Sequence, residues 1–321
     1  MMKKLTILLT LKDRSVYTKR WFESNVFPEF NYFIADGSFG EENKKICKNY
    51  ISSNVEYVRY RPDSTYKIYI QKRLDALKKI NTRFVMFADN DDFILREGLL
   101  RIMKDLESDP AVSLAQGKVG TVTSNNEGLF AKSADWPHFL KNGRSNEEKF
   151  MDFFVNSYSL FYSVSETKIQ KRIFQIFQKS KTENPYIVEE FQTFFSIVLS
   201  KSKSMPYYYY VRQVGSEGSM HQIFANIFRF DLCINESFNK SFIFLISQLS
   251  KSLVHLSYIE IFNLVREYQI SKFNIHPLRL RSHVIQVIRL KSTLLLANIK
   301  FLFCFKTTKL VSHKEIVSLY T

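Results

Sequence analysis

The chain has 321 residues, of which 45% are hydrophobic, and its formal net charge is +15 at pH 7. This composition is ample for a sizeable core and predicts one large or two small globular domains. The three cysteines (Cys47, Cys233 and Cys304) lie far apart, which is typical of a reducing compartment and gives no disulfide framework or zinc site. No stretch reaches the roughly 18 uncharged apolar residues of a membrane span. The apolar run Leu5–Leu11 lacks a cleavage site, so it indicates a first strand rather than a signal peptide.

Strands and helices alternate through the first third of the chain. Short apolar runs predict strands, and apolar residues with helical spacing predict helices. This alternation indicates a mostly parallel sheet with helices on both faces. In chain order we expect a strand at 5–10, a helix at 15–25, a strand at 31–35, a helix at 41–51, a strand at 55–60, a helix at 69–79, a strand at 83–88 and a helix at 98–107.

The remaining two thirds are less regular. From residue 223 onward the pattern is largely helical, with strong amphipathic periodicity between 242 and 265. A boundary near 215–235 would divide residues 1–220 from a basic, mainly helical region at 221–321. The other expected elements are antiparallel strands around 119–123, helices at 168–178 and 187–200, and an aromatic strand at 207–211.

An acidic cluster follows the strand expected at 83–88. Asp89, Asp91 and Asp92 lie at the carboxyl end of that strand, where open α/β sheets bind their ligands. Asp89 and Asp91 would share one side of an extended chain, and paired carboxylates suit a hard cation such as Mg²⁺ or Mn²⁺. The alternative is a solvated turn, because Asp and Asn favour turns and helix caps. We assign Asp92 to a cap of the following helix.

Three blocks together resemble a family 2-type glycosyltransferase with a GT-A fold. They are Thr10-Leu11-Lys12-Asp13-Arg14, Asp36-Gly37-Ser38 and Asp89-Asn90-Asp91-Asp92, each after an expected strand. Their order and spacing match the family over roughly residues 1–220, with Asp13 at the position where the family has Asn. The resemblance implies a Rossmann-like, mostly parallel α/β sheet with flanking helices, followed by a mainly helical C-terminal region.

The resemblance also implies roles in binding a nucleotide diphosphate sugar, with a UDP-sugar favoured. Asp36 would accept a hydrogen bond from the base, since uracil offers one imide donor. Asp91, with Asp89, would hold a divalent Mn²⁺ or Mg²⁺ ion at the diphosphate. The alternative for Asp36 is that Asp36-Gly37-Ser38 is only a turn. The alternative for the arginines named below is that they are solvated side chains without a ligand. The further contacts with the donor sugar nucleotide that we expect are Thr10, Arg14, Arg61, Arg73 and Arg212. The guanidinium groups of the four arginines match phosphate geometry.

The family places an acidic pair about 100 residues after the metal motif, where it takes a proton from the acceptor hydroxyl. Glu189 and Glu190 fit this pattern at the start of an expected helix. Glu190 aligns with the usual Asp and is our choice, with Glu189 as the substitute. The alternative is a carboxylate that interacts with the helix dipole. Beyond Arg212, a serine-containing loop would close over the diphosphate, and His221 would supply a third metal ligand. The alternative for His221 is a structural histidine.

The C-terminal part of the chain is basic. Between Gln269 and Lys314 there are nine Lys or Arg residues and no Asp or Glu. Mixed with Leu and Phe, these suit an interfacial helix on an anionic membrane. The same apolar faces would equally suit packing on the catalytic domain or a homo-oligomer contact, and the two interpretations stay open.

The resemblance therefore implies a metal-dependent, inverting glycosyltransferase with a glycan or lipid-linked acceptor in bacterial surface polysaccharide synthesis. It would be cytoplasmic, or peripheral at the inner face of the cell membrane. A nucleotidyltransferase on a similar sheet is a second hypothesis, but residues 10–14 contain no glycine. A non-catalytic polyanion-binding protein is a third. It would leave the acidic cluster without a role, and the sequence has no recognised nucleic-acid module, so no nucleic acid is expected.

Overall fold

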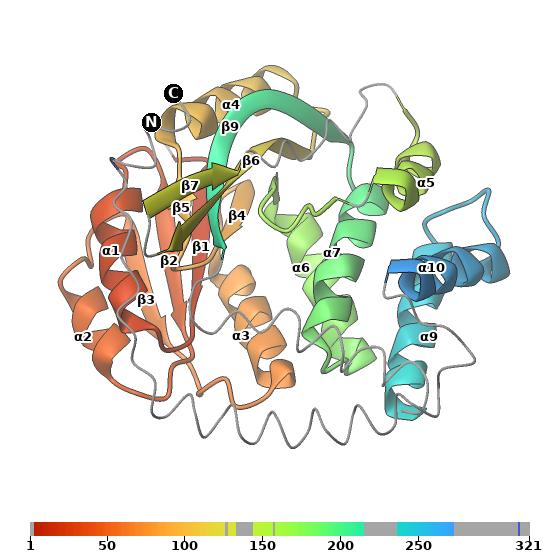
Figure 1. The fold of residues 1–321 in the computed structure, drawn as a ribbon, viewed down its shortest axis with the longest axis horizontal. Helices are drawn as coiled ribbons and strands as arrows, with labels where there is room; N and C mark the ends of the chain where they lie inside the picture. Colours follow the sequence, from red (N-terminus) through yellow and green to blue (C-terminus); the bar gives the residue numbers. More distant parts are fainter. Residues whose placement is uncertain are drawn as a thin grey trace.

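The computed structural model describes residues 3–125, 128–132, 144–156, 158–214, 236–272 and 314. The boundary expected at 215–235 therefore lies outside the described residues, as do His221 and the basic segment 273–313. Within them the chain forms one mixed sheet with helices on both faces (Figure 1).

The sheet has nine strands, in the spatial order β3-β2-β1-β4-β8-β6-β9-β5, with β7 paired to β6. The first four are parallel, as predicted. The strand expected around 119–123 is part of β6, which is antiparallel to β7 and β8 but parallel to β9. The strands are β1 (Leu5–Leu11), β2 (Asn31–Asp36), β3 (Val55–Arg59), β4 (Phe84–Ala88), β5 (Phe93–Ile94), β6 (Leu114–Asn125), β7 (Gly128–Lys132), β8 (Val164–Glu166) and β9 (Ser202–Val214).

The helices follow the predicted order with shifted ends. α3 begins three residues before the predicted start because Thr65 caps it, its hydroxyl accepting from the amide of Ile68 at 3.4 Å. The periodic segment at 242–265 belongs to two helices separated by a break at 251–257. The helices are α1 (Ser15–Asn25), α2 (Glu42–Lys48), α3 (Tyr66–Lys79), α4 (Arg96–Ser108), α5 (Asn146–Asn156), α6 (Thr167–Ser180), α7 (Pro185–Leu199), α9 (Glu236–Ser250) and α10 (Tyr258–Lys272).

The strand order reverses at β1. The chain moves outward from β1 through β2 to β3 and then returns to place β4 on the other side of β1. In the parallel register Leu11 lies beside Asp36, and Leu9 lies beside Ala88. The carboxyl ends of β1, β2 and β4 therefore meet at one edge, which is the usual ligand site of an open α/β sheet.

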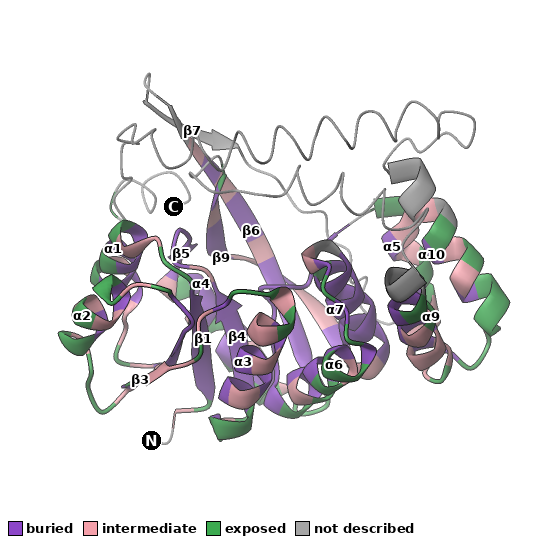
Figure 2. Cartoon of the chain, turned by 90° about the horizontal axis from the view of Figure 1, so that it is seen from below, coloured by how far each residue is buried: buried purple, intermediate pink, exposed green. Residues whose placement is uncertain are grey.

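Apolar side chains hold these strands between two helical layers. All seven residues of β1 are buried (Figure 2). α1 covers one face through Trp21, whose ring meets those of Phe22 and Tyr32 edge-on. On the other side of the molecule, α9 packs against α6 and α7, where Ser241 donates to the Ser180 carbonyl at 2.8 Å. In the described part of the chain, the helices are too short or too polar to cross a membrane.

Gly98 on α4 gives a test of this packing. A Cβ at this position would lie 1.8 Å from the Tyr208 carbonyl oxygen on β9. Gly98→Ala should therefore lower the free energy of unfolding by about 1–3 kcal/mol in urea denaturation, although alanine normally favours a helix. Glu97→Ala, at the exposed neighbouring position, is the control and should change it by less than about 0.5 kcal/mol. An equally stable Gly98→Ala variant would contradict this close approach.

Candidate active site

Asp91 is held by two arginines at the end of β4. Arg14 donates from Nη2 to Asp91 Oδ2 at 2.7 Å, and Arg20, on α1, donates to the Asp91 carbonyl oxygen at 2.6 Å. The Arg20 guanidinium also donates to Gln213 on β9 at 2.7 Å. Burial lowers the pKa of Arg20 to about 10, so it stays charged at neutral pH. The carboxylate and backbone of Asp91 are thus compensated from the N-terminal part of the chain.

Asp92 does not cap α4, which corrects the role assigned from the sequence. The N-cap of α4 is Leu95, with no side-chain cap. Asp92 is instead buried, and its carboxylate accepts from the hydroxyl of Tyr210 and the amide of Gln213, each at 2.9 Å. Burial, and then Asp91, raise the pKa of Asp92 well above the ordinary aspartate value. Its role is structural, because these two hydrogen bonds connect β9 to the segment that follows β4.

Asp89 is the more open carboxylate of the cluster, with its side chain 37% exposed. Its Oδ2 accepts from the hydroxyl of Tyr162 at 2.7 Å, and its Oδ1 lies 3.9 Å from Arg73. The ring of Tyr162 stacks on Tyr210 at 4.5 Å, and the Arg212 guanidinium lies over the same ring at 5.3 Å. Asp89 therefore lies where β4, α3 and β9 meet.

The turn after β1 is strained. Asp13 and Arg14 have φ angles of 55° and 58°, a left-handed conformation that costs about 1–3 kcal/mol each in residues other than glycine. The Asp13 amide donates to the hydroxyl of Ser38 at 2.8 Å, and Asn43 donates to the Asp13 carbonyl at 2.8 Å. These bonds hold the turn so that Arg14 reaches Asp91.

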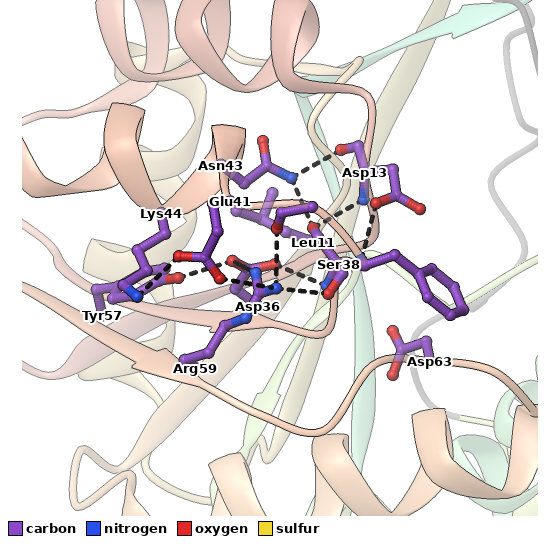
Figure 3. A network of polar contacts seen from close by, with 12 residues as sticks. Leu11, Asp13, Asp36, Ser38, Glu41, Asn43, Lys44, Tyr57, Arg59 and Asp63 are labelled. Carbon is purple, nitrogen blue, oxygen red and sulfur yellow. Dashed lines mark hydrogen bonds and ion pairs between the residues drawn. The ribbon is translucent and has the colours of Figure 1, made fainter.

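Asp36 is fully buried within protein contacts. Its carboxylate accepts from the hydroxyl of Tyr57 at 2.7 Å, from Arg59 at 2.5 Å and from the amide of Ser38 at 2.9 Å (Figure 3). The oxygen expected to meet a nucleotide base is therefore engaged by protein donors in this structure. Arg61, expected to contact the donor, is exposed and forms no ion pair within the described residues.

Arg73 is a fully buried arginine surrounded by aromatic rings. Its guanidinium donates to the hydroxyl of Thr10 at 3.0 Å, and its carbon lies 4.6–5.9 Å from four ring centroids. Its Nε and Nη1 atoms have no hydrogen-bond partner in the part of the chain described. Donors left unmet beside the partly exposed Asp89 are suited to an anionic ligand, because a buried unpaired donor is costly. The rings belong to Tyr69, Phe87, Phe161 and Phe174.

The two glutamates of the expected acidic pair differ in their surroundings. Glu190 is buried, whereas Glu189 is exposed. Protein nevertheless surrounds the carboxyl group of Glu189, and the resulting desolvation raises its pKa. Asp89 and Glu190 add to that rise, and Arg212 and then Arg73 oppose it. The phenol of Tyr162, with Asp92, Glu189 and Asp89, in turn raises the pKa of Arg212.

The structure thus brings together most residues selected from the sequence. His221 lies outside the described residues. Sequence reasoning missed Tyr162, Tyr210 and Arg20 as parts of the site. Only Tyr210 had a signal, since it lies in the aromatic run on β9; Arg20 follows Lys19 on α1 and looks like an ordinary surface residue.

This arrangement, with its switch point between β1 and β4 and a carboxylate cluster after β4, is a GT-A-type α/β fold, and the predicted fold class is confirmed. Among solved structures, the chain is similar to S. aureus TarS. It superposes on TarS residues 1–349 in complex with UDP with a TM-score of 0.54 and 14% identity, covering 85% of this chain and 72% of that one. The superposition on the same TarS residues in complex with UDP-GlcNAc has a TM-score of 0.55 and 15% identity, and it covers 85% of this chain and 73% of that one.

The chain spans 44% of the longer TarS structure, with a TM-score of 0.53 and 14% identity. At this level of identity the likeness shows the fold. No protein-family model matches the sequence, and no curated protein matches it.

The hydroxyl of Tyr210 gives a test of the site's construction. It donates to Asp92 and accepts from the amide of Asp89 at 3.2 Å. Tyr210→Phe should lower the free energy of unfolding by about 1–3 kcal/mol, because a buried carboxylate oxygen loses its donor. Tyr207→Phe, on the same strand but half-exposed, is the control and should have little effect in the same denaturant titration. Equal stability of the two variants would contradict this role of Tyr210.

Proposed function

We propose that the protein is a glycosyltransferase that moves a sugar from a nucleotide diphosphate sugar, a UDP-sugar in particular, to a hydroxyl group of an acceptor. The observation that carries this proposal is the convergence of Asp89, Glu189, Arg73 and Arg212 at the carboxyl edge of a GT-A-type sheet. The likeness to structures solved with UDP and with UDP-GlcNAc supports the choice of donor.

Glu189 is the general base in this proposal, in place of Glu190. Glu189 has no hydrogen bond or ion pair from its carboxylate within the described residues, and it is exposed where Glu190 is buried. A raised pKa suits a base that takes a proton in the transition state. The acceptor oxygen, losing its proton to Glu189, attacks the anomeric carbon as the bond to the diphosphate breaks. A single displacement of this kind inverts the configuration at that carbon.

The leaving group is a nucleoside diphosphate, whose growing negative charge needs compensation. Arg212 and Arg73 both lower the pKa of Glu189, and Arg73, which has unmet donors, lies 3.9 Å from Asp89. Arg14, which holds Asp91, is close enough to the same edge to exchange that partner for phosphate oxygens. We therefore assign the three arginines to the diphosphate and Thr10 to the support of Arg73.

A divalent ion such as Mn²⁺ or Mg²⁺ fits the donor set at Asp89 and Asp91. Mg²⁺ is usually bound by one or two carboxylates, with substrate phosphates and water as the remaining ligands. Asp89 offers a partly exposed carboxylate, and the described residues hold no cluster of three or more His, Cys, Asp or Glu that would complete an all-protein site. Bound there, the ion would supply Lewis-acid neutralisation of the diphosphate. His221 stays a proposed third ligand.

The acceptor class comes from the sequence resemblance. We propose a glycan or lipid-linked acceptor in bacterial surface polysaccharide synthesis, at the cytoplasmic face of the membrane. The basic segment that follows α10 supports contact with an anionic lipid surface. Asp36 remains a proposed base contact; because its carboxylate is buried beneath three protein donors, these surroundings would have to open before it could accept from uracil.

Binding of the donor nucleotide is the first test. UDP with Mn²⁺ should raise the melting temperature, because a ligand that binds only the folded state stabilises it, by about 2.7 kcal/mol at a hundredfold excess over Kd. Asp89→Asn should lose the metal-dependent part of the shift. Asp105→Asn, a carboxylate on α4, is the matched control and should keep it. No shift with UDP or GDP plus metal would contradict the proposal.

The identity of the base is the second test. Glu189→Gln should bind UDP normally and lower the rate of transfer by about 10²–10⁴-fold, because an amide cannot replace the carboxylate as proton acceptor. Glu190→Gln is the matched control and should keep most of the activity. Transfer by the wild type should rise with pH through the raised pKa of Glu189, since only its ionised form accepts a proton. Normal transfer by Glu189→Gln would show that the base lies elsewhere.

A further inference from the structure

Four polar contacts close a ring at the ends of the first three strands. Lys72 Nζ, on α3, donates to the carbonyl oxygen of Leu11 at 2.9 Å and to Asp63 Oδ2. The Asp63 amide donates to the Gly37 carbonyl at 2.8 Å, and the Gly37 amide donates to the same Leu11 oxygen at 3.0 Å. One lysine and one aspartate therefore join the ends of β1 and β2 to the segment after β3.

This ring is dry and closely packed. The side chains of Lys72 and Asp63 are each 1% exposed. A Cβ at Gly37 would lie 2.5–2.6 Å from three atoms of the Asp63 carboxyl group, so only glycine leaves room for it. Figure 3 shows that carboxylate beside the turn that carries Ser38. Asp63 Oδ1 has no partner within the described residues.

Stability alone does not account for such a pair. A buried ion pair often contributes no more than apolar residues of the same size, because desolvation offsets the attraction. The ring does fix the backbone of Leu11 and Gly37. These residues flank the strained turn at Asp13 and the loop at Ser38. Those segments form the edge where an open α/β sheet meets its ligand.

We propose that Lys72 and Asp63 are positioning residues for the nucleotide part of the donor, and that their ion pair holds the strand ends in the conformation that binds it. This inference rests on the proposed function and adds to it a determinant of donor affinity that does not touch the reacting atoms. Breaking the pair weakens donor binding and leaves the chemical step largely intact.

The ion pair is sensitive to pH. Desolvation lowers the pKa of Lys72 to about 8 from 10.5, against the opposing attraction of Asp63. The other charges facing Lys72 are Arg73, on α3, which favours the neutral form, and Asp36, on β2, which favours the charged form. Asp63 is faced in addition by Lys12, after β1, and burial raises its pKa. As the pH rises through about 8, the lysine progressively loses its proton and the ion pair with it.

Loss of the pair does not unfold the protein on this account. Because the pKa of Lys72 is lower in the folded than in the unfolded chain, the unfolded chain binds this proton more tightly between about pH 8 and 10. The contribution of Lys72 to the free energy of unfolding therefore rises with pH in that window. Donor affinity and the Lys72 contribution to stability should respond to pH in opposite directions, which separates positioning from destabilisation through this pair.

The test is a titration of the full chain with UDP and Mn²⁺ from about pH 6.5 to 8.8, below ionisation of the uracil imide. The wild-type Kd should increase about fivefold over this range as Lys72 loses its proton. Lys72→Met with Asp63→Asn should raise Kd about tenfold or more at pH 6.5 and abolish the pH dependence. In transfer assays this double variant should raise the donor KM and keep kcat within about threefold.

The matched control is Lys78→Met with Asp75→Asn, which removes an exposed ion pair from the same helix and should behave as wild type. A folded Lys72/Asp63 double variant with unchanged Kd overturns the inference. If that variant does not fold, the wild-type series decides, and a constant Kd across the range overturns it. A wild type that binds no UDP at any pH overturns the proposed function instead, and the inference falls with it.

Discussion

The burial of carboxylates at the end of β4 is the constraint on which the site depends. Asp91 and Asp92 are 8% and 3% exposed, and a buried charge is tolerated only when it is paired or hydrogen-bonded. Partners therefore have to come from elsewhere in the chain. Arg14 and Arg20 come from the N-terminal turn and helix, and Tyr210 comes from β9. Compensating these aspartates thus brings together segments nearly two hundred residues apart, which explains why β9 and α1 lie against the same edge.

The turn after β1 shows how local strain serves this compensation. A glycine at Asp13 or Arg14 would adopt the left-handed conformation without cost. The chain has side chains there instead, and both are used: Asp13 accepts from the amide of Phe39 at 2.9 Å, and Arg14 binds Asp91. These hydrogen bonds offset the strain in the backbone. Glycine would relieve the strain but could not form the bonds made by the side chains of Asp13 and Arg14.

Much of the fold follows from the sequence, because the strands that matter are short, apolar and bounded by turn residues. The position of Asp36 and Asp89 at strand ends was predictable for the same reason. Their surroundings were not, since Tyr57, Arg59 and Tyr162 approach them only once the sheet has formed. The difference in exposure between Glu189 and Glu190 has the same origin. Glu189 and Glu190 are indistinguishable by type, and only the rotation of α7 against its neighbours decides which is exposed.

The balance of charge at this edge bears on how a diphosphate would be held. Three of the cations there already have a carboxylate: Arg14 has Asp91, Arg59 has Asp36, and Lys72 has Asp63. Among the described residues, Arg73 and Arg212 face Asp89 and Glu189 without a close ion pair. The edge is therefore close to neutral despite a chain charge of +15. A diphosphate entering it adds several negative charges beside carboxylates, which costs free energy unless a cation arrives with it or an arginine leaves its aspartate. Under the proposed function, a divalent ion bound with the donor would meet that requirement, and the exchange of Arg14 from Asp91 to phosphate would free the second carboxylate to hold it.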